Sequence, residues 1–227
     1  MSSAACNGLE GMTLLLLDIT MSLDGFVAGR NRTLEQPLGE GGEQLHEWLF
    51  RLAGFRAQHG LTGGEENADS GAYAWQSGAG AVVMGRRMFS GGAGPWENDP
   101  NAGGWWGEEP PFHVPVFVLT KHPRETVELQ GGTTFTFVTD GIESALERAR
   151  EAAGVRHVQL AGGANVVQQY LRAGLVDELR IHIAPLFLGD GVRLFGDGGP
   201  DLELVEVIDS PSATHLRYRV LNREGDA

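Results

Sequence analysis

The 227-residue chain is poor in cysteine, in basic residues and in long apolar runs, and each shortage excludes a class of protein. One cysteine, Cys6, cannot form an internal disulfide, which favours a reducing, cytoplasmic compartment. The 17 Lys and Arg residues face 30 Asp and Glu residues, so the net charge of −13 argues against nucleic acid and anionic membranes as partners. The longest apolar candidate, residues 14–17, is far shorter than the ~20 residues that span a bilayer.

Chemical motifs of several enzyme classes are missing as well. No His, Cys and Asp residues stand at metal-ligand spacing, so we expect no metal. There is no Gly-x-Ser-x-Gly nucleophile motif. Residues 1–11 lack the basic start and apolar core of a signal peptide, and we interpret them as a flexible extension before a single domain at 12–227.

Apolar runs and turn residues predict strands that alternate with helices. Strands are expected at 13–20, 81–84, 114–120, 133–138, 155–160, 179–185, 202–210 and 214–222, and helices at 43–57, from 85, at 142–153 and at 164–172. Asp140 and Glu143 are typical of a capping box at the third helix. Residues 59–80 are either a long loop or a short helix around 68–75 between loops. The order predicts an α/β fold with a mixed, mostly parallel sheet and an antiparallel C-terminal edge.

Two strand-to-helix junctions could hold an anion. At the first, Gly85 is followed by Arg86 and Arg87, which could grip a phosphate, although a packing glycine beside surface arginines explains the pattern equally. At the second, Gly162 and Gly163 expose backbone amides before a helix, although they could also form a simple tight turn.

Both junctions lie at the carboxyl ends of strands, as do Thr120 and Lys121. Ligands of open α/β sheets bind at such ends, so these groups should converge on one cleft. Bare glycine backbone together with local cations on an acidic chain suits a phosphate-rich dinucleotide, and a 2′-phosphate would explain the cations.

The pattern resembles the dihydrofolate reductase superfamily, in particular the branch that contains the riboflavin-biosynthesis reductase domain. The resemblance spans residues 13–220 and depends on five stretches in the order of that family: Ser22-Leu23-Asp24-Gly25-Phe26, Met84-Gly85-Arg86-Arg87-Met88-Phe89, Val118-Leu119-Thr120, Gly162-Gly163, and Asp177-Glu178-Leu179 leading to Pro185-Leu186-Phe187-Leu188-Gly189. It implies a three-layer fold with a central eight-stranded sheet, NADPH across the strand ends, and a homodimer.

The resemblance also assigns cofactor residues. It implies that the adenosine 2′-phosphate is surrounded by Gly85, Arg86, Arg87, Thr120 and Lys121, that the pyrophosphate lies on Gly162, Gly163, Ala164, Asn165 and Val166, and that Thr20 and Val27 flank the nicotinamide. The folate enzymes carry a substrate carboxylate on the first helix, where this chain offers Glu43, His46 and Glu47.

Candidate substrate contacts are weaker. Asp24 could touch a substrate or form a turn, and Trp96, Trp105 and Trp106 could stack on a flat heterocycle or anchor a long loop. Phe26 and His46 complete this set.

The sequence therefore predicts an NADPH-dependent reductase that transfers a hydride to a small, heterocyclic substrate. The substrate would be of the 5-amino-6-(5-phosphoribosylamino)uracil type or pterin-like. A phosphorylated substrate needs a second basic pocket, for which Arg124 and Arg193 are the candidates. The alternatives are a catalytically silent NADP-binding sensor and a flavin-binding reductase.

Overall fold

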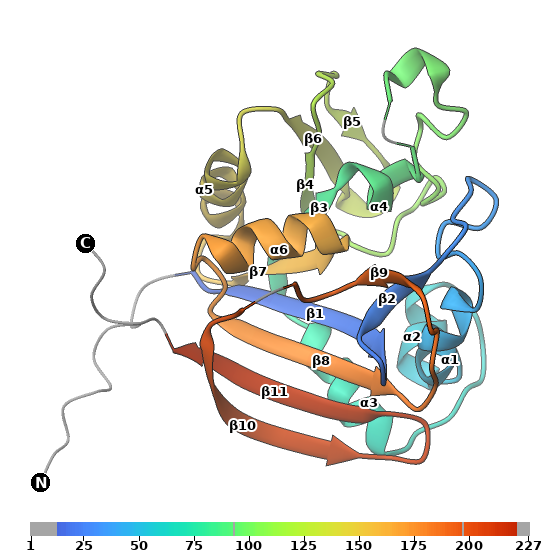
Figure 1. The fold of residues 1–227 in the computed structure, drawn as a ribbon. Coiled ribbons are helices and arrows are strands. Elements are labelled where there is room, and N and C mark those ends of the chain that lie inside the picture. The colour runs from blue at the N-terminus through green and yellow to red at the C-terminus, as the bar shows by residue number, and fades with distance from the viewer. Residues whose placement is uncertain (1–12, 93, 197, 222–227) are drawn as a thin grey trace, which may run out of the picture.

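A nine-stranded mixed sheet organises the computed structural model, which describes residues 13–92, 94–196 and 198–221 (Figure 1). The strand order is β10-β11-β8-β1-β7-β3-β4-β6-β5. From β8 to β6 all neighbours are parallel, while β11 and β10 at one edge and β5 at the other are antiparallel. The strands are β1 (Leu15–Ser22), β3 (Ala79–Gly85), β4 (Pro115–Leu119), β5 (Val127–Glu128), β6 (Thr134–Val138), β7 (His157–Gly162), β8 (Glu178–Ala184), β10 (Asp201–Asp209) and β11 (Thr214–Leu221).

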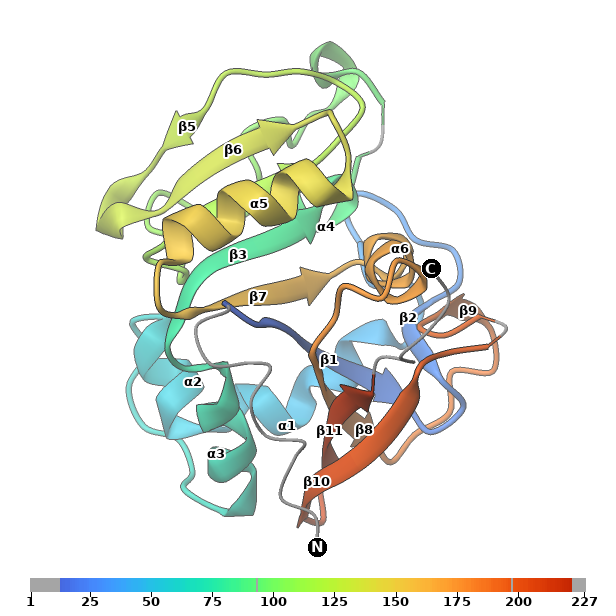
Figure 2. The ribbon, with the colours of Figure 1, turned by 90° about the vertical axis from the view of Figure 1, so that its left-hand side faces the viewer.

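Helices cover both faces of this sheet. The helices α5 (Ile142–Ala153) and α6 (Ala164–Arg172) pack on one face, and α3 (Ala68–Tyr73) crosses the other face behind β8 and β11 in Figure 1. Figure 2 shows α1 (Glu47–Phe50) and α2 (Ala53–Gln58) beside α3. The short α4 (Arg86–Ser90) follows β3, and the 3-10 turns are η1 (Gly42–His46), η2 (Ala74–Gln76), η3 (Trp96–Asn98) and η4 (Gln130–Gly132).

Burial explains why the central strands read as continuous apolar runs. Leu15, Leu17, Val83 and Leu160 are fully buried because helices or loops cover both faces of parallel strands. Beneath α5 and α6 these side chains form the main core, and a second cluster around Phe89 and Phe135 lies on the opposite face.

The predicted fold class is confirmed, with two small elements that the sequence did not reveal. The two-residue β5 adds a ninth strand to the sheet. Outside the sheet, β2 (Phe26–Gly29) pairs antiparallel with β9 (Gly191–Arg193), and no strand was predicted at either segment. Both elements are too short to leave a periodic pattern.

The predicted helix at 43–57 is broken into η1, α1 and α2. Leu52 is extended, with φ −72° and ψ 135°, because the flanking backbone bonds to Glu65: the amide of Ala53 donates to its carbonyl at 3.0 Å. The apolar positions still face the core, since Leu45, Trp48 and Leu52 are buried. Residues 68–75 do form the short helix α3 and η2, which resolves that alternative.

The expected capping box of α5 is wrong. Gly141 occupies the N-cap position with φ 108° and makes no side-chain cap. Asp140 lies one residue too early, and its carboxylate instead accepts hydrogen bonds from the Ser144 hydroxyl (2.9 Å) and from Arg148 (2.8 Å).

No helix in the described ranges has the length and apolar character needed to cross a membrane. The expectations about residues 1–11 and Cys6 concern residues outside those described.

Candidate active site

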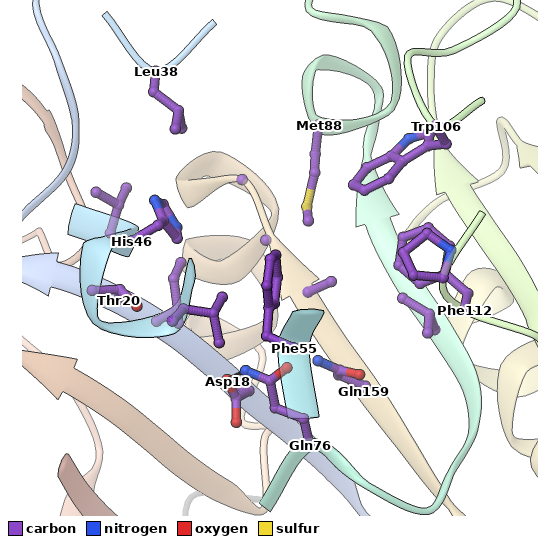
Figure 3. Close-up of a pocket in the computed structure, with 18 of the residues that line it drawn as sticks. Asp18, Thr20, Leu38, His46, Phe55, Gln76, Met88, Trp106, Phe112 and Gln159 are labelled. Carbon is purple, nitrogen blue, oxygen red and sulfur yellow. Dashed lines mark hydrogen bonds between the residues drawn. The ribbon is translucent and has the colours of Figure 1, made fainter. Parts of the chain in front are cut away.

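A cavity of about 1280 Å³ extends along β1, β3 and β7 to their carboxyl ends. Its wall combines strand ends with the polar segment 32–38, the α1–α2 region and the loop 105–114 (Figure 3). Nine predicted site residues line it: Thr20, Val27, His46, Arg87, Trp105, Trp106, Gly162, Gly163 and Ala164.

The two predicted junctions meet at this edge of the sheet. Strands β3 and β7 are parallel neighbours, and Met84 pairs with Gly162. Gly162 takes φ +121°, a value open to glycine, and Gly163 then begins α6 with free space where a side chain would stand. The first turn of α6 therefore offers unpaired amides to the cavity, which is the usual way a helix start holds an anion.

Arg87 and Arg32 place two cations on the same wall. Both line the cavity, and within the described ranges neither side chain has an ion-pair or hydrogen-bond partner. Burial lowers the pKa of the Arg32 guanidinium, and the like charge of Arg87 lowers it further. Two unpaired guanidinium groups that repel each other form a site that an anion would stabilise.

The sequence predicted that the guanidinium groups of Arg86 and Arg87 would both be free to bind a phosphate, but the Arg86 group has partners within the protein. Its side chain is buried and forms a 2.5 Å ion pair with Asp99, a hydrogen bond with Ser90, and a contact over the Trp96 ring. The cause is helical geometry: Arg86 and Arg87 point to different sides of α4, and the Arg86 side meets the 96–99 turn. The Arg86 guanidinium is therefore occupied by Asp99 and does not line the cavity, so its contact with a phosphate stays a prediction.

Other predicted cofactor residues lie outside the lining. Gly85 is a packing glycine: a Cβ there would stand 2.9 Å from Cγ2 of the buried Val166. The Thr120 hydroxyl accepts from the His122 amide at 3.1 Å, Lys121 is exposed, and the Asn165 side chain accepts from Gln169 at 2.8 Å. Contacts of these five residues with a coenzyme stay predictions.

Three of the predicted substrate residues are structural. The Asp24 carboxylate accepts hydrogen bonds from the Ser22 hydroxyl (2.5 Å) and the amides of Leu188 (3.2 Å) and Gly189 (2.7 Å), which lowers its pKa. Phe26 is buried beneath the Arg193 guanidinium. Trp96 donates to the His122 carbonyl at 2.9 Å and packs on Phe137. Each of these side chains stabilises a turn or loop outside the cavity lining, so substrate contacts of Asp24, Phe26 and Trp96 stay predictions.

Aromatic rings cover the rest of the cavity wall. Trp106 packs against Phe112 with centroids 4.8 Å apart, and Phe55 contacts Phe50 at 5.5 Å and His59 at 4.0 Å. Figure 3 shows Phe55 between the Trp106 side and the His46 side of the cavity. Such a wall suits a flat ligand, and Trp106 lines the cavity, so its contact with a substrate stays a prediction.

Unpartnered polar atoms interrupt this apolar wall. Three residues of the cavity wall each carry a buried polar atom without a hydrogen-bond partner among the described residues: Asp18 Oδ2, His46 Nδ1 and Trp106 Nε1. Burial lowers the pKa of His46 to about 4, so its ring is neutral at physiological pH. Because buried polar groups are nearly always paired, these atoms mark positions that a ligand would satisfy.

Asp18, Arg32 and Gln76 are functional candidates that sequence reasoning missed. Asp18 interrupts the apolar run of β1, and an acid in a buried strand is a signal, since carboxylates are rarely buried without a partner. Gln76 donates to Asp18 at 2.9 Å from η2, a contact with no sequence signal. Of the three candidates on the first predicted helix, Glu43 and Glu47 are exposed, and His46 of η1 is the one that lines the cavity.

The sheet order and the cavity at the strand ends define the dihydrofolate-reductase-like class of α/β proteins. The RibD C-terminal domain family model matches residues 13–216. The chain belongs to this family of RibD-like reductase domains, within the dihydrofolate reductase superfamily that the sequence resembles.

Individual proteins with similar sequences or structures are known as well. The chain is 23% identical over 185 residues to the uncharacterized protein YyaP of Bacillus subtilis, covering 81% of this chain and 80% of YyaP. A putative riboflavin biosynthesis protein from Shewanella sp. PV-4 superposes with a TM-score of 0.61 at 21% identity, over 92% of this chain and all of that one. A diaminohydroxyphosphoribosylaminopyrimidine deaminase/5-amino-6-(5-phosphoribosylamino)uracil reductase from Thermotoga maritima gives 0.53 at 15% identity, over 93% of this chain and 58% of that one.

Proposed function

We propose that this protein is an NADPH-dependent reductase of a flat, unphosphorylated heterocycle that resembles a pterin. The observation that carries the proposal is the convergence of α6 amides, two unpaired arginines and an aromatic wall on one cavity. Membership of a family of RibD-like reductase domains supports reduction as the chemistry.

The described residues fit a phosphorylated dinucleotide. Gly163 leaves room for a pyrophosphate against the Ala164 and Asn165 amides, and Arg87 with Arg32 would bind a 2′-phosphate. Thr20 and Val27 line the same cavity and would flank the nicotinamide. The bound coenzyme would supply a hydride, while the protein orients both reactants and excludes water.

The cavity wall favours a substrate without a phosphate. Among the lysine and arginine residues of the described ranges, those that line the cavity are Arg32 and Arg87, and the coenzyme phosphate would bind to both. Arg124 donates to the Ala102 carbonyl, and Arg193 to the Asp24 carbonyl at 3.2 Å, so neither candidate for a second basic pocket reaches the cavity. A ring with polar edges would instead satisfy Asp18, His46 and Trp106.

The test is a reduction assay with a matched panel. The purified protein is mixed with NADPH and either dihydropterins, unphosphorylated aminopyrimidines or the ribosylaminopyrimidine 5′-phosphate, and coenzyme oxidation is followed by absorbance. We expect oxidation with an unphosphorylated ring and little with the phosphorylated one.

Three other outcomes would change the proposal. Preference for the phosphorylated pyrimidine would overturn the substrate class. NADPH binding without oxidation by any ring would favour a silent NADP-binding sensor. A flavin that copurifies with the protein would favour a flavin-binding reductase.

A further inference from the structure

Four buried side chains form a continuous hydrogen-bonded row that begins at the cavity. Asp18 Oδ1 lies 3.1 Å from His182 Nε2, His182 Nδ1 lies 2.7 Å from His215 Nδ1, and His215 Nε2 lies 2.8 Å from Asp69 Oδ1. We call this the Asp18–Asp69 row. The exposed fraction of each residue is 7% or less. Three elements of the sheet, β1, β8 and β11, present the first three residues on one face, and α3 adds the fourth.

The three contacts fix how many protons the row holds. A carboxylate and a bare imidazole nitrogen are both acceptors, so each contact needs one proton between its two atoms. Two bare nitrogens at 2.7 Å would repel each other, so a proton lies between the two Nδ1 atoms as well. Three contacts therefore hold three protons, whereas two neutral imidazoles bring two. With both carboxylates ionised, the histidine pair carries one positive charge.

A fourth proton could bind to the row at one remaining atom, a carboxylate oxygen that has no hydrogen-bond partner among the described residues. Asp69 Oδ2 accepts from the Ser212 hydroxyl, but Asp18 Oδ2 is buried without a partner among the described residues, in a side chain that belongs to the cavity wall. A proton on Asp18 Oδ2 would face a bound ligand. When it leaves, Asp18 Oδ1 still accepts from His182 and, at 2.9 Å, from Gln76. All three contacts of the row thus survive the loss.

The surroundings keep the row away from water, and the ionised neighbours are paired with one another. Trp48 packs on both imidazoles, with centroids 4.7 and 4.8 Å apart, and Trp75 stacks on His182 at 6.0 Å. The titratable neighbours are His46 on η1 and His157 on β7. Two arginines also lie nearby, and each has a carboxylate partner: Arg180 of β8 pairs with Glu178, and Arg217 of β11 pairs with Glu206. Burial lowers the pKa of His215, while the hydrogen bond to Asp69 opposes this shift.

Position connects Asp18 to the reacting end of the cavity. Asp18 and Thr20 are two residues apart on β1, so their side chains share a face about 7 Å apart. Thr20 accepts from Trp48 Nε1 at 3.2 Å and would flank the nicotinamide. Figure 3 shows Asp18 and Thr20 on the same side of Phe55 as His46, with Gln76 beside Asp18.

We propose that Asp18 is the proton donor of the reductase, and that the His182–His215 pair is the positioning cation behind it; the proposal rests on the proposed function. The reduced nicotinamide coenzyme supplies a hydride, which forms a C–H bond as the substrate C=N or C=O π bond breaks. Asp18 Oδ2 gives its proton to the nitrogen or oxygen, which forms N–H or O–H. The coenzyme leaves oxidised, and Asp18 regains a proton from water.

The first test counts protons without coenzyme or substrate. In the full chain with ¹⁵N-labelled histidine, nuclear magnetic resonance at about pH 7 distinguishes neutral from cationic imidazoles. We expect His182 and His215 together to carry three protons, with one exchange-protected N–H signal between them. Two neutral rings with two protons would overturn the proposed cation.

The second test uses Asp18→Asn, which keeps the shape of the side chain but cannot supply the proton. We expect kcat to fall about 10²–10⁴-fold with little change in KM or coenzyme affinity. The rate of the wild-type enzyme should fall as pH rises, because Asp18 must hold its proton, and the variant should lose this limb. Glu203→Gln, on the exposed edge strand β10, is the matched control.

Asp69→Asn tests the positioning role through the same pH profile. It should move the pH at which the wild-type rate falls, because the charge of the histidine pair changes, while the Asp18→Asn profile stays flat. If Asp18→Asn kept the rate and the pH profile of the wild type, the donor role would be overturned and the reductase proposal would stand. No coenzyme oxidation by the wild type with any ring would instead overturn the reductase proposal.

Discussion

Neighbouring charged residues of this chain differ in role because burial differs. Arg86 is 7% exposed and paired with Asp99, whereas Arg87 is exposed on the cavity wall without a partner in the described ranges. The sequence shows two adjacent arginines after a strand, and it cannot show which one the loop 96–99 covers. That depends on a tertiary contact thirteen residues away.

Stability should separate the two arginines. Arg86→Ala leaves Asp99 buried without its cation, so we expect the free energy of unfolding to fall by about 3–5 kcal/mol. Arg87→Ala should change it by less than about 0.5 kcal/mol, as surface substitutions do. Urea denaturation of both variants measures the difference, and equal losses would contradict the assigned roles.

His46 should make stability depend on pH between about 6.5 and 4. Its folded pKa is lowered to about 4, so below the unfolded value of 6.5 the unfolded chain binds a proton that the folded chain does not. The free energy of unfolding therefore falls as pH falls from 6.5 to 4, by roughly 1–3 kcal/mol from this ring. His46→Gln should flatten that slope in denaturation curves. An unchanged slope would show that His46 is protonated in the folded state.

At the scale of elements, strong apolar runs predicted the strands well, but they did not predict where a helix is broken or where short strands pair. The runs at β1, β3 and β4 are buried on both faces and read directly from the sequence. The break at Leu52 depends on pairing with Glu65, and the ribbon of β2 and β9 joins segments over 160 residues apart. Long-range backbone pairing of short segments leaves no local pattern, so these elements could not be predicted.

The same limit applies to the candidate site. Glycines at Gly162 and Gly163 and the start of α6 could be predicted, because a strand-to-helix turn is a local feature. The Asp18–Asp69 row could not, because His182 and His215 look isolated in the sequence and meet through the β8–β11 register.

Packing of β3 against α6 should determine where the α6 amides lie. Gly85→Ala would place a methyl group 2.9 Å from Val166 Cγ2, which pushes the helix start away and should weaken coenzyme binding several-fold. Val166→Ala in the same chain makes room, so the double variant should regain much of the affinity. A coupling of about 1 kcal/mol or more in this double-mutant cycle would support packing. Independent losses would instead indicate that Gly85 touches the ligand.

At the scale of the whole molecule, one end of the sheet remains uncovered. Leu202, Leu204 and Val207 of β10 pair across the strands with Val220, Tyr218 and Leu216 of β11, so they share the face on which α6 packs further along. They are 41%, 54% and 49% exposed, and no described helix covers them (Figure 1). An apolar face beside an unpaired strand edge is typical of an interface.

We propose that a second copy of the chain covers this face, in line with the homodimer that the family resemblance implies. Leu204→Glu should place a charge in the interface and shift the protein to monomer in sedimentation equilibrium. Val155→Glu, at a fully exposed site after α5, is the control and should leave the mass unchanged. A wild-type monomer at all concentrations would contradict the proposal.

The central claim is that the arginines and the α6 amides form one site for a 2′-phosphorylated dinucleotide. The most direct measurement is calorimetric titration of wild type and Arg87→Ala with NADPH and with NADH. We expect the wild type to prefer NADPH, and Arg87→Ala to lose about tenfold or more in NADPH affinity, close to 1.4 kcal/mol, with NADH affinity nearly unchanged. Equal losses for both coenzymes, or no binding of either by the wild type, would contradict the account.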